Sequence, residues 1–495
     1  MIHYIEKLSA FNSNTAILAD GKTYTYAQLL HASSIVAANL LNNKIDLAEE
    51  RVAFMVNPGF NYVAVQWGIW RAGGVAVPLC ITYPLASLQY VIENAGVKII
   101  ICDDSFTDTL MPLVQEKNIK LYNSNQLQIG NLVDLPILDT ERKAMILYTS
   151  GTTNLPKGVI STFDNLDAQI SSLINAWEWK STDHTLCLLP LHHVHGIVNI
   201  VCCSLFSGAK CEFLNKFSPD TVFEIFNKKQ VNVFMAVPTI YYKLISFWDT
   251  LSIDKQKEIK SNLETFRLMI SGSAALPMSV MDRWKEISGH TLLERYGMTE
   301  IGMAISNPYN GERLAGYVGL ALPGVEVRLA AEDDTEIHNE PGEIQIKGKN
   351  VFSEYWERPE ETQKSFTKDG WFKTGDIAIL EKGYYKILGR NSTDIIKSGG
   401  YKISALEIEE VLRTYPKIDD CAVIGINNEE WGELVVAALV TNTEIDTAEL
   451  SSWMKEKIAS YKTPKKYIIM QELPRNTMGK VTKKDIKELF YTLEI

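Results

Sequence analysis

The sequence predicts an α/β fold in which mostly parallel sheets are covered by helices. Three observations lead to this class. Short β-rich runs alternate with helical patterns over residues 1–389, most runs end in Gly, Pro or Ser, and no internal repeat interrupts the alternation. Strand–turn–helix alternation is typical of parallel sheets. Such sheets bind ligands at the loops beyond the carboxyl ends of their strands, so we expect the site there.

The elements follow from the apolar pattern, taken in chain order. Residues 51–56 and 97–102 are predicted as buried strands, and residues 26–43 and 87–94 as helices. Further short apolar runs lie at residues 144–148, 185–189, 231–236 and 268–271.

The pattern changes after about Gly311. Strand patterns at 325–329, 342–347 and 384–388, with Gly and Asp turns between them, predict a smaller antiparallel β unit. From Asn391 onward, helical patterns at 405–414 and 448–459 flank strand patterns at 421–426 and 434–440. We therefore expect a large N-terminal domain, residues 1–389, and a small mobile α+β domain, residues 390–495, with the boundary near 389–394.

Composition narrows the class of protein. Of 495 residues, 46% are hydrophobic and 22% charged, as in ordinary soluble globular proteins. The 49 Lys and Arg against 60 Asp and Glu give a formal charge of −11, which argues against nonspecific binding to nucleic acid or to an anionic membrane. Seven cysteines without a C-x-x-C pattern suggest free thiols in a reducing compartment. With neither a signal-peptide core nor an apolar run of about 18 residues, a cytoplasmic enzyme without a membrane span is expected.

The most informative motif spans residues 148–158 and follows a strand pattern. It combines hydroxyls, glycines and one lysine, the groups that hold a polyphosphate. It departs from the Walker A pattern, because Pro156 replaces the second glycine and Gly158 replaces the Mg²⁺-binding Ser or Thr. A solvent-exposed Ser/Thr turn is the alternative interpretation.

Other polar turns follow in order along the chain. Residues 271–277 end a strand in small side chains, residues 294–300 supply an aromatic ring, a hydroxyl and a carboxylate, and residues 374–376 place a carboxylate on a tight turn. Polar stretches follow at 389–402 and 474–480. Each alone could be an ordinary turn, but their combination in this order points to one nucleotide site.

These motifs resemble those of the adenylate-forming superfamily, which includes acyl- and aryl-CoA synthetases, firefly luciferase and nonribosomal-peptide adenylation domains. The similarity runs from about Thr23 to Val481. It implies a large N-terminal domain and a small C-terminal domain that rotates between two half-reactions, with ATP, Mg²⁺ and coenzyme A as cofactor or co-substrates.

The resemblance also implies residue roles. Thr299 would contact the α-phosphate, Glu300 would coordinate Mg²⁺, and Lys480 would bridge the α-phosphate and the attacking carboxylate. The ATP-binding residues would be Thr149, Ser150, Gly151, Thr152, Thr153, Lys157, Gly272, Ser273, Ala274, Ala275, Tyr296, Asp376 and Arg390. The chemistry agrees, since attack of an ionised carboxylate on phosphorus needs orientation and charge neutralisation but no general base.

Two features bear on the acceptor. No carrier-protein domain follows Lys480, so free coenzyme A is the simplest acceptor, and a separate carrier protein is the alternative. Gly399, Gly400 and Tyr401 would lie beside the pantetheine path. A luciferase-like oxygenase would share the same scaffold and remains a rival of another class.

The acid is suggested by three residues. His193 stands where amino-acid-activating relatives carry an Asp, which disfavours an amino-acid substrate. Arg295 before Tyr-Gly-Met-Thr-Glu is most similar to malonyl-CoA synthetases, although Lys243 stands where an Arg is usual in them. The resemblance predicts a short dicarboxylate such as malonate or methylmalonate, bound by Arg295 with the help of Lys243. If Arg295 instead pairs structurally with Glu294 or another acid, a short- or medium-chain monocarboxylate is the alternative.

Overall fold

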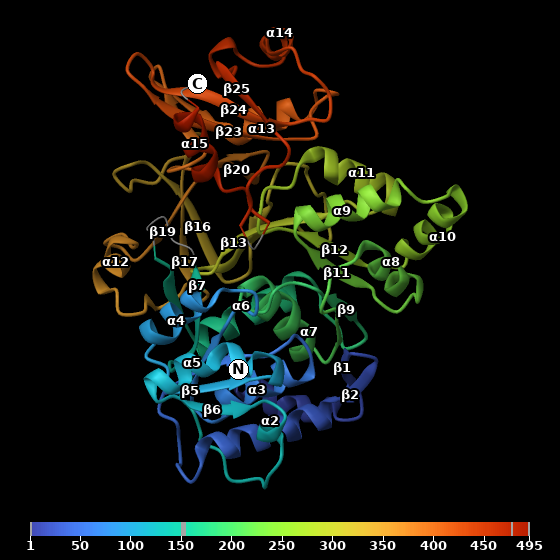
Figure 1. Ribbon diagram of the computed structural model, residues 1–495, viewed down its shortest axis with the longest axis vertical. Helices are drawn as coiled ribbons and strands as arrows, with labels where there is room; N and C mark the ends of the chain where they lie inside the picture. Colours follow the sequence, from blue (N-terminus) through green and yellow to red (C-terminus); the bar gives the residue numbers. More distant parts are fainter. Residues whose placement is uncertain (1, 150–154, 477–478, 494–495) are drawn as a thin grey trace.

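The chain forms two large mixed sheets, a smaller antiparallel sheet and a separate C-terminal sheet (Figure 1). The computed structural model describes residues 2–149, 155–476 and 479–493, with side chains from Ile5 onward. The predicted α/β class, with a large N-terminal part and a small C-terminal domain, is confirmed.

The nine-stranded sheet is parallel in its centre. Its order is β15-β14-β13-β12-β11-β9-β10-β1-β2, and only β2, β14 and β15 at its edges run antiparallel to their neighbours. The strands are β1 Thr15–Ala19, β2 Lys22–Thr25, β9 His184–Cys187, β10 Lys210–Phe213, β11 Val233–Ala236, β12 Leu268–Ser271, β13 Leu293–Met298, β14 Gly302–Ser306 and β15 Leu320–Ala321.

The seven-stranded sheet has the order β18-β8-β7-β4-β3-β5-β6, with a parallel centre and an antiparallel edge formed by β8 and β18. Its strands are β3 Arg51–Met55, β4 Val75–Pro78, β5 Ile99–Cys102, β6 Lys120–Asn123, β7 Lys143–Thr149, β8 Lys157–Thr162 and β18 Glu354–Tyr355. The polyphosphate motif thus connects two antiparallel strands, β7 and β8, rather than a strand and a helix.

Helices fill the space between the large sheets and cover their outer faces. The helices are α1 Ile2–Lys7, α2 Tyr26–Leu41, α3 Phe60–Arg71, α4 Leu85–Asn94, α5 Thr107–Lys117, α6 Phe163–Ala176, α7 Cys203–Phe206, α8 Pro219–Asn227, α9 Pro238–Trp248, α10 Ile253–Leu263, α11 Met278–Ser288, α12 Pro359–Lys364, α13 Ala405–Leu412, α14 Thr447–Lys457 and α15 Lys483–Thr492. A π-helix, η4, spans His195–Cys202.

Burial on both faces explains the continuous apolar strands. In β11, Val233 packs into the core that holds α2, α3, α6 and η4 between the sheets, whereas its neighbour Phe234 packs under α8 to α11 on the opposite face. Parallel strands covered on both sides need apolar residues at every position. On the outer face of the seven-stranded sheet, α4 and α5 pack over residues such as Ile100.

Local capping interactions set helix ends that the apolar periodicity of the sequence does not predict. The Thr25 hydroxyl accepts the N–H of Gln28, and the Thr25 N–H donates to the Gln28 side chain, so α2 begins at Tyr26. Asn42 takes a left-handed conformation with φ 42° and ends α2 at Leu41, two residues before the predicted end.

The four-stranded sheet and the C-terminal sheet come last in the chain. The four-stranded antiparallel sheet contains β16 Val325–Ala330, β17 Gly342–Gly348, β19 Phe372–Glu381 and β20 Tyr384–Arg390. The C-terminal sheet contains β21 Ile395–Ser398, β22 Tyr401–Ser404, β23 Asp420–Asn428, β24 Gly432–Val440 and β25 Lys466–Met470. Helices α13 and α14 pack on one face of the C-terminal sheet and α15 on the other.

The C-terminal domain, orange to red in Figure 1, lies against the end of the molecule that carries β13 and α11. One contact joins the two domains through a helix end. Helix α11 has no side-chain cap from Pro277, and the Met278 N–H donates instead to Glu410 Oε2 of α13 at 3.2 Å. Lys402 Nζ also lies 2.8 Å from Glu332 Oε1. Within the described residues, no helix is long and apolar enough to span a membrane.

Candidate active site

The predicted polyphosphate motif lies at the β7–β8 hairpin. Thr149 ends β7 and faces Lys157 at the start of β8, while Ser150, Gly151, Thr152 and Thr153 lie outside the described residues. The Lys157 ammonium forms an ion pair with Glu361 of α12 and lies 5.1 Å from the ring centroid of Tyr355. A cation is therefore held at the base of this loop.

Glu300 meets the same tyrosine from another element. Thr299 and Glu300 occupy the turn between β13 and β14, and the Tyr355 hydroxyl donates to Glu300 Oε1 at 3.0 Å. Burial raises the pKa of Glu300, although the Tyr355 bond opposes the shift. Tyr355 thus contacts both the Glu300 carboxylate and the Lys157 ammonium. It lies 55 residues after Glu300 in the sequence, and Lys157 is farther away still.

The surroundings of Glu300 fit a magnesium ion. Mg²⁺ commonly binds one or two protein carboxylates together with substrate phosphates and water. Across residues 2–149, 155–476 and 479–493, no group of three or more His, Cys, Asp or Glu side chains is arranged to hold a metal on its own. A single carboxylate beside the predicted phosphate-binding loop is the donor set expected for an ion shared with a nucleotide.

A second group of polar side chains surrounds Asp376 of β19. The Tyr296 hydroxyl donates to Asp376 Oδ2 at 2.6 Å, and Arg390 Nη1 donates to Oδ1 at 3.2 Å. Arg390 fits beside Gly375, whose φ of 75° is favourable for glycine. Asp376 therefore joins predicted ATP-binding residues from two sheets, Tyr296 of the nine-stranded sheet and Arg390 of the four-stranded sheet, through direct hydrogen bonds. The carboxylate keeps lone pairs for further donors.

Lys480 comes to this region from the C-terminal domain. Gly479 packs on Thr239 at the start of α9, where an added Cβ would lie 3.1 Å from the Thr239 hydroxyl oxygen. Lys480 reaches solvent, yet desolvation by the surrounding protein lowers the pKa of its ammonium, and the nearby charges of Asp376 and Glu300 oppose that shift. The C-terminal domain thus places Lys480 among the predicted nucleotide-binding groups.

An acyl-sized cavity of about 260 Å³ opens beside Gly479. Its lining residues are Leu188, Leu189, Pro190, His193, His195, Gly196, Phe217, Val237, Thr239, Ile240, Lys243, Ser273 and Gly479. Two predicted acyl-site residues, His193 and Lys243, are among them. Burial lowers the pKa of His193 to about 3, so its imidazole is neutral near pH 7 and Lys243 supplies the cation of the wall.

Arg295 of β13 lies behind this wall. Its side chain is 4% exposed, and Nη2 lies 3.4 Å from the hydroxyl oxygen of Ser273. The guanidinium packs flat on Gly272, where an added Cβ would lie 2.6 Å from Cζ. Burial lowers the pKa of Arg295 to about 9, which leaves it charged near pH 7.

The alternative pairing of Arg295 with Glu294 is wrong. Adjacent strand residues point to opposite faces of a sheet, and the Glu294 carboxyl group is buried near the backbone of Gly316 and Leu276 instead. No carboxylate forms an ion pair with Arg295 in the part of the chain that the structure describes. Among the described residues, the buried guanidinium therefore has no acidic partner.

Sequence reasoning missed several contributing side chains. Ser273, predicted to line the adenine site with Gly272, Ala274 and Ala275, turns its hydroxyl toward the acyl cavity and His195. His195 lies two residues after His193, the one histidine of this segment that the sequence analysis selected. Tyr355 and Glu361 lie outside every recognised motif, and only the fold brings them to Lys157.

The Gly399–Gly400 turn shows why two glycines are needed there. Both have positive φ, 56° and 83°, and they join β21 to β22 in a two-residue hairpin. Gly399 packs on Trp431, and Tyr401 stacks on Tyr461 with 4.5 Å between ring centroids. These contacts lie within the C-terminal domain, so the role of the hairpin in binding coenzyme A stays a prediction.

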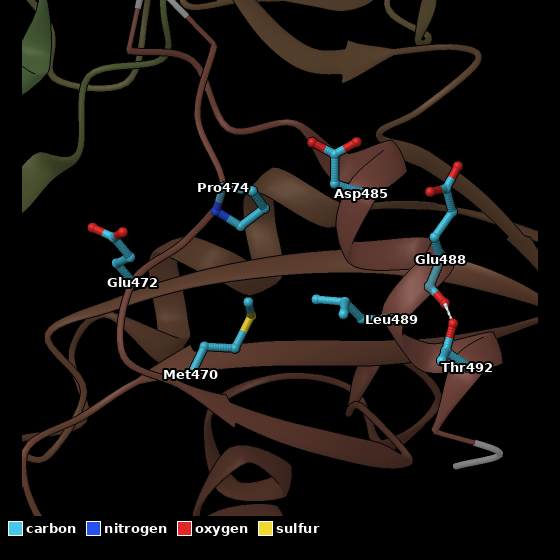
Figure 2. A pocket seen from close by; sticks show the side chains of 7 residues that line it. All are labelled: Met470, Glu472, Pro474, Asp485, Glu488, Leu489 and Thr492. Atoms are coloured by element: carbon cyan, nitrogen blue, oxygen red, sulfur yellow. Dashed lines mark hydrogen bonds between the residues drawn. The ribbon is translucent and has the colours of Figure 1, made fainter.

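A larger hollow of about 480 Å³ lies on the C-terminal domain between the end of β25 and α15 (Figure 2). Glu472, Asp485 and Glu488 stand around it, with Met470 and Leu489 at its floor. Three carboxylates would repel ATP, coenzyme A and a carboxylic acid. The smaller cavity beside Lys480 is therefore the candidate active site.

Comparisons with known proteins agree with this geometry. The AMP-binding enzyme family matches residues 6–356, and the AMP-binding enzyme C-terminal domain matches residues 407–480. The mitochondrial malonate–CoA ligase of Xenopus laevis is 42% identical to the chain, and the match covers 97% of the chain and 90% of the ligase. The mitochondrial malonate–CoA ligase of Homo sapiens is 41% identical, and the match covers 97% of the chain and 91% of the ligase. The crystal structure of ATP-bound MatB from Rhodopseudomonas palustris has a TM-score of 0.92 and 33% identity, with 100% of both chains covered. The chain therefore belongs to the AMP-binding enzymes of the adenylate-forming superfamily.

Proposed function

We propose that the protein is an ATP-dependent malonate–CoA ligase, which activates a short dicarboxylic acid as its acyl-AMP and transfers the acyl group to coenzyme A. The buried, acid-free guanidinium of Arg295 behind the acyl cavity carries this proposal. Malonate–CoA ligases that match nearly the whole chain support the same acid.

A second carboxylate on the substrate explains why the acyl cavity has positive charges at its wall. A buried guanidinium without a counter-charge is costly, whereas a carboxylate bound beside it forms charge-assisted hydrogen bonds. Lys243 on the cavity wall adds a second positive charge. A monocarboxylate such as butyrate would place an apolar tail beside both charges and leave them unpaired.

The first half-reaction needs two anions to meet. The substrate carboxylate attacks the α-phosphorus of ATP, an acyl–phosphate bond forms, and pyrophosphate leaves. Lys480 holds the attacking carboxylate and the α-phosphate together, and Thr299 contacts the same phosphate. Lys157, Thr149 and the hairpin residues 150–153 hold the β- and γ-phosphates, while Asp376, Arg390 and Tyr296 hold the nucleoside. Glu300 would hold Mg²⁺, which would supply positive charge to the phosphates. The protein needs no general base because the acid is already ionised.

The second half-reaction requires a thiol to reach the acyl-AMP. The coenzyme A sulfur attacks the acyl carbon, a thioester forms, and AMP leaves. In the present arrangement Lys480 occupies the site, and the Gly399–Gly400 hairpin contacts Trp431 of its own domain. We propose that the C-terminal domain, residues 390–495, rotates about the segment near residues 389–394, withdraws Lys480 and brings Gly399, Gly400 and Tyr401 to the pantetheine path.

Two further assignments complete the proposal. Coenzyme A rather than a carrier protein is the acceptor, as in the names of the similar ligases. The seven cysteines are free and buried, which suits a reducing compartment such as the cytoplasm. The similar enzymes of Xenopus laevis and Homo sapiens are named mitochondrial, so fluorescence localisation of the tagged chain tests this assignment.

A pyrophosphate-release assay tests the function directly. The enzyme is given ATP, Mg²⁺ and coenzyme A with malonate, methylmalonate, acetate or butyrate, and the thioester is identified by mass spectrometry. Malonate or methylmalonate should give the highest kcat/KM. A preference for butyrate or acetate would refute the dicarboxylate, and pyrophosphate release without a CoA thioester would refute the acceptor.

A further inference from the structure

Three polar side chains, the buried Arg295 and His195 and the half-buried Ser273, form a continuous chain beside the acyl cavity. Arg295 Nη2 lies 3.4 Å from Ser273 Oγ, and Ser273 Oγ lies 3.0 Å from His195 Nδ1. Ser273 and His195 line the cavity, and His195 is only 4% exposed. The three residues lie on separate elements, β13, the end of β12 and the start of η4, so the fold assembles them.

The chemistry of the three groups sets the direction of each hydrogen bond. A guanidinium can only donate, so Ser273 Oγ accepts from Arg295. The Ser273 hydroxyl proton then needs an acceptor, and His195 Nδ1 is the one within hydrogen-bond distance in the described part of the chain. Burial, with the charge of Arg295, lowers the pKa of His195 far below its usual range, so the ring is neutral. A neutral imidazole that accepts at Nδ1 carries its proton on Nε2.

The proton on Nε2 finds no hydrogen-bond acceptor in the part of the chain that the structure describes. Of the described side chains, His195 Nε2 is among the buried polar atoms for which no hydrogen bond is formed. A buried donor left without an acceptor costs free energy, and folded proteins seldom leave one. A substrate oxygen in the adjoining cavity would satisfy it.

The backbone is shaped to hold this chain of bonds. Ser273 has φ 70°, a left-handed conformation that few residues other than glycine adopt. Gly272 leaves room for the Arg295 guanidinium, which an added Cβ would overlap at 2.6 Å. Strain of this kind persists where the surrounding structure requires it, commonly at a ligand site.

We propose that His195 is a specificity-determining residue for the second carboxylate of the acyl substrate: Nδ1 orients the Ser273 hydroxyl toward it, and Nε2–H donates to the carboxylate. The inference rests on the proposed function, since it assigns a donor within the same site. Arg295 supplies the charge, whereas His195 supplies a directed N–H whose position depends on Ser273.

Two substitutions separate the two ring nitrogens. In His195→Asn, the shorter amide can still accept the Ser273 proton at the Nδ1 position but provides no donor at the Nε2 position. In His195→Gln, the longer amide can provide that donor and loses the acceptor near Ser273. The kcat and KM of both variants are measured with malonate and with butyrate, using ATP and coenzyme A, and His31→Gln on the exposed face of α2 serves as the control.

We expect His195→Asn to lower kcat/KM for malonate about tenfold to a hundredfold, mainly through KM, because a hydrogen bond to a charged group is lost. Butyrate should be nearly unaffected, and His195→Gln should retain more malonate activity than His195→Asn. Equal losses for malonate and butyrate, or an unchanged malonate-to-butyrate ratio in His195→Asn, would overturn the assignment. A wild-type enzyme that does not prefer malonate would refute the proposed function itself, so the two failures are distinguishable.

Discussion

Replacing Arg295 with methionine removes the buried guanidinium and keeps an unbranched side chain of similar length. Arg295 has no acidic partner among the described residues, so the substitution breaks no ion pair and leaves Gly272 and Ser273 in place. A charge-assisted hydrogen bond contributes about 1.5–3 kcal/mol. Since about 1.4 kcal/mol corresponds to a factor of ten, kcat/KM for malonate should fall about tenfold to a few hundredfold.

The same change should spare or improve butyrate, because an apolar tail then meets methionine rather than a charge. Pyrophosphate release is measured for malonate and butyrate on one preparation, so that a folding defect lowers both rates together. Arg295→Lys retains the charge without the planar fork and should recover part of the malonate activity. Arg283→Met on α11 is the matched control, because that side chain is 44% exposed and pairs with Asp249 and Glu286 at the surface.

Two outcomes would refute this reasoning. If malonate and butyrate lose activity equally in Arg295→Met, the guanidinium has a structural role. If Arg295→Lys is no better than Arg295→Met, the charge at this position does not select the acid.

Three other changes test separate parts of the site. Lys480→Ala should abolish formation of the acyl-AMP yet still convert supplied malonyl-AMP and coenzyme A to thioester; equal loss in both assays would contradict the division between half-reactions. Glu300→Gln should lower activity and raise the Mg²⁺ concentration needed for half-maximal rate, and an unchanged Mg²⁺ dependence would remove Glu300 from the metal site. Burial raises the pKa of Glu294 to about 8, so the folded chain keeps this proton at pH values where the unfolded chain, with an ordinary pKa near 4.5, has lost it. Stability should therefore fall as pH rises from about 4.5 to about 8, and Glu294→Gln should remove up to a few kcal/mol of that loss. Urea unfolding at pH 5 and pH 8.5 measures the effect, and equal pH slopes in both proteins would exclude it.

Much of the fold could be predicted because burial on both faces leaves a direct trace in the sequence. Strand β12 coincides with the predicted run at 268–271, since parallel strands covered on both sides form nearly continuous apolar runs. The β7–β8 hairpin was harder to foresee. A loop rich in glycine and hydroxyls suggests a helix after it, yet the β-branched residues that follow Lys157 form an antiparallel strand.

The candidate site also has a part that the sequence could predict and a part that depends on the fold. Residues in recognised motifs, such as Asp376 and Tyr296, are joined by a direct hydrogen bond, although their roles stay predictions. The Arg295–Glu294 pair stayed open from the sequence, because no strand was predicted at residues 293–298 and the alternation of side chains argues against the pair only once β13 is known. No local pattern reveals that Ser273 is the neighbour of Arg295 instead. The contact between Ser273 and His195 joins residues 78 positions apart, so it depends on how η4 and β12 meet in space.

The bond between Glu410 and the first turn of α11 links helix stability to domain orientation. Helix α11 takes its cap from the other domain, so the proposed rotation would leave the Met278 N–H without this partner. Caps of this kind are worth about 0.5–2 kcal/mol, which corresponds to an approximately two- to thirtyfold bias in the equilibrium between orientations. The resting enzyme would therefore populate the orientation that is ready for ATP and the acid, and the ligands of the second half-reaction would have to supply at least this much binding free energy to shift it.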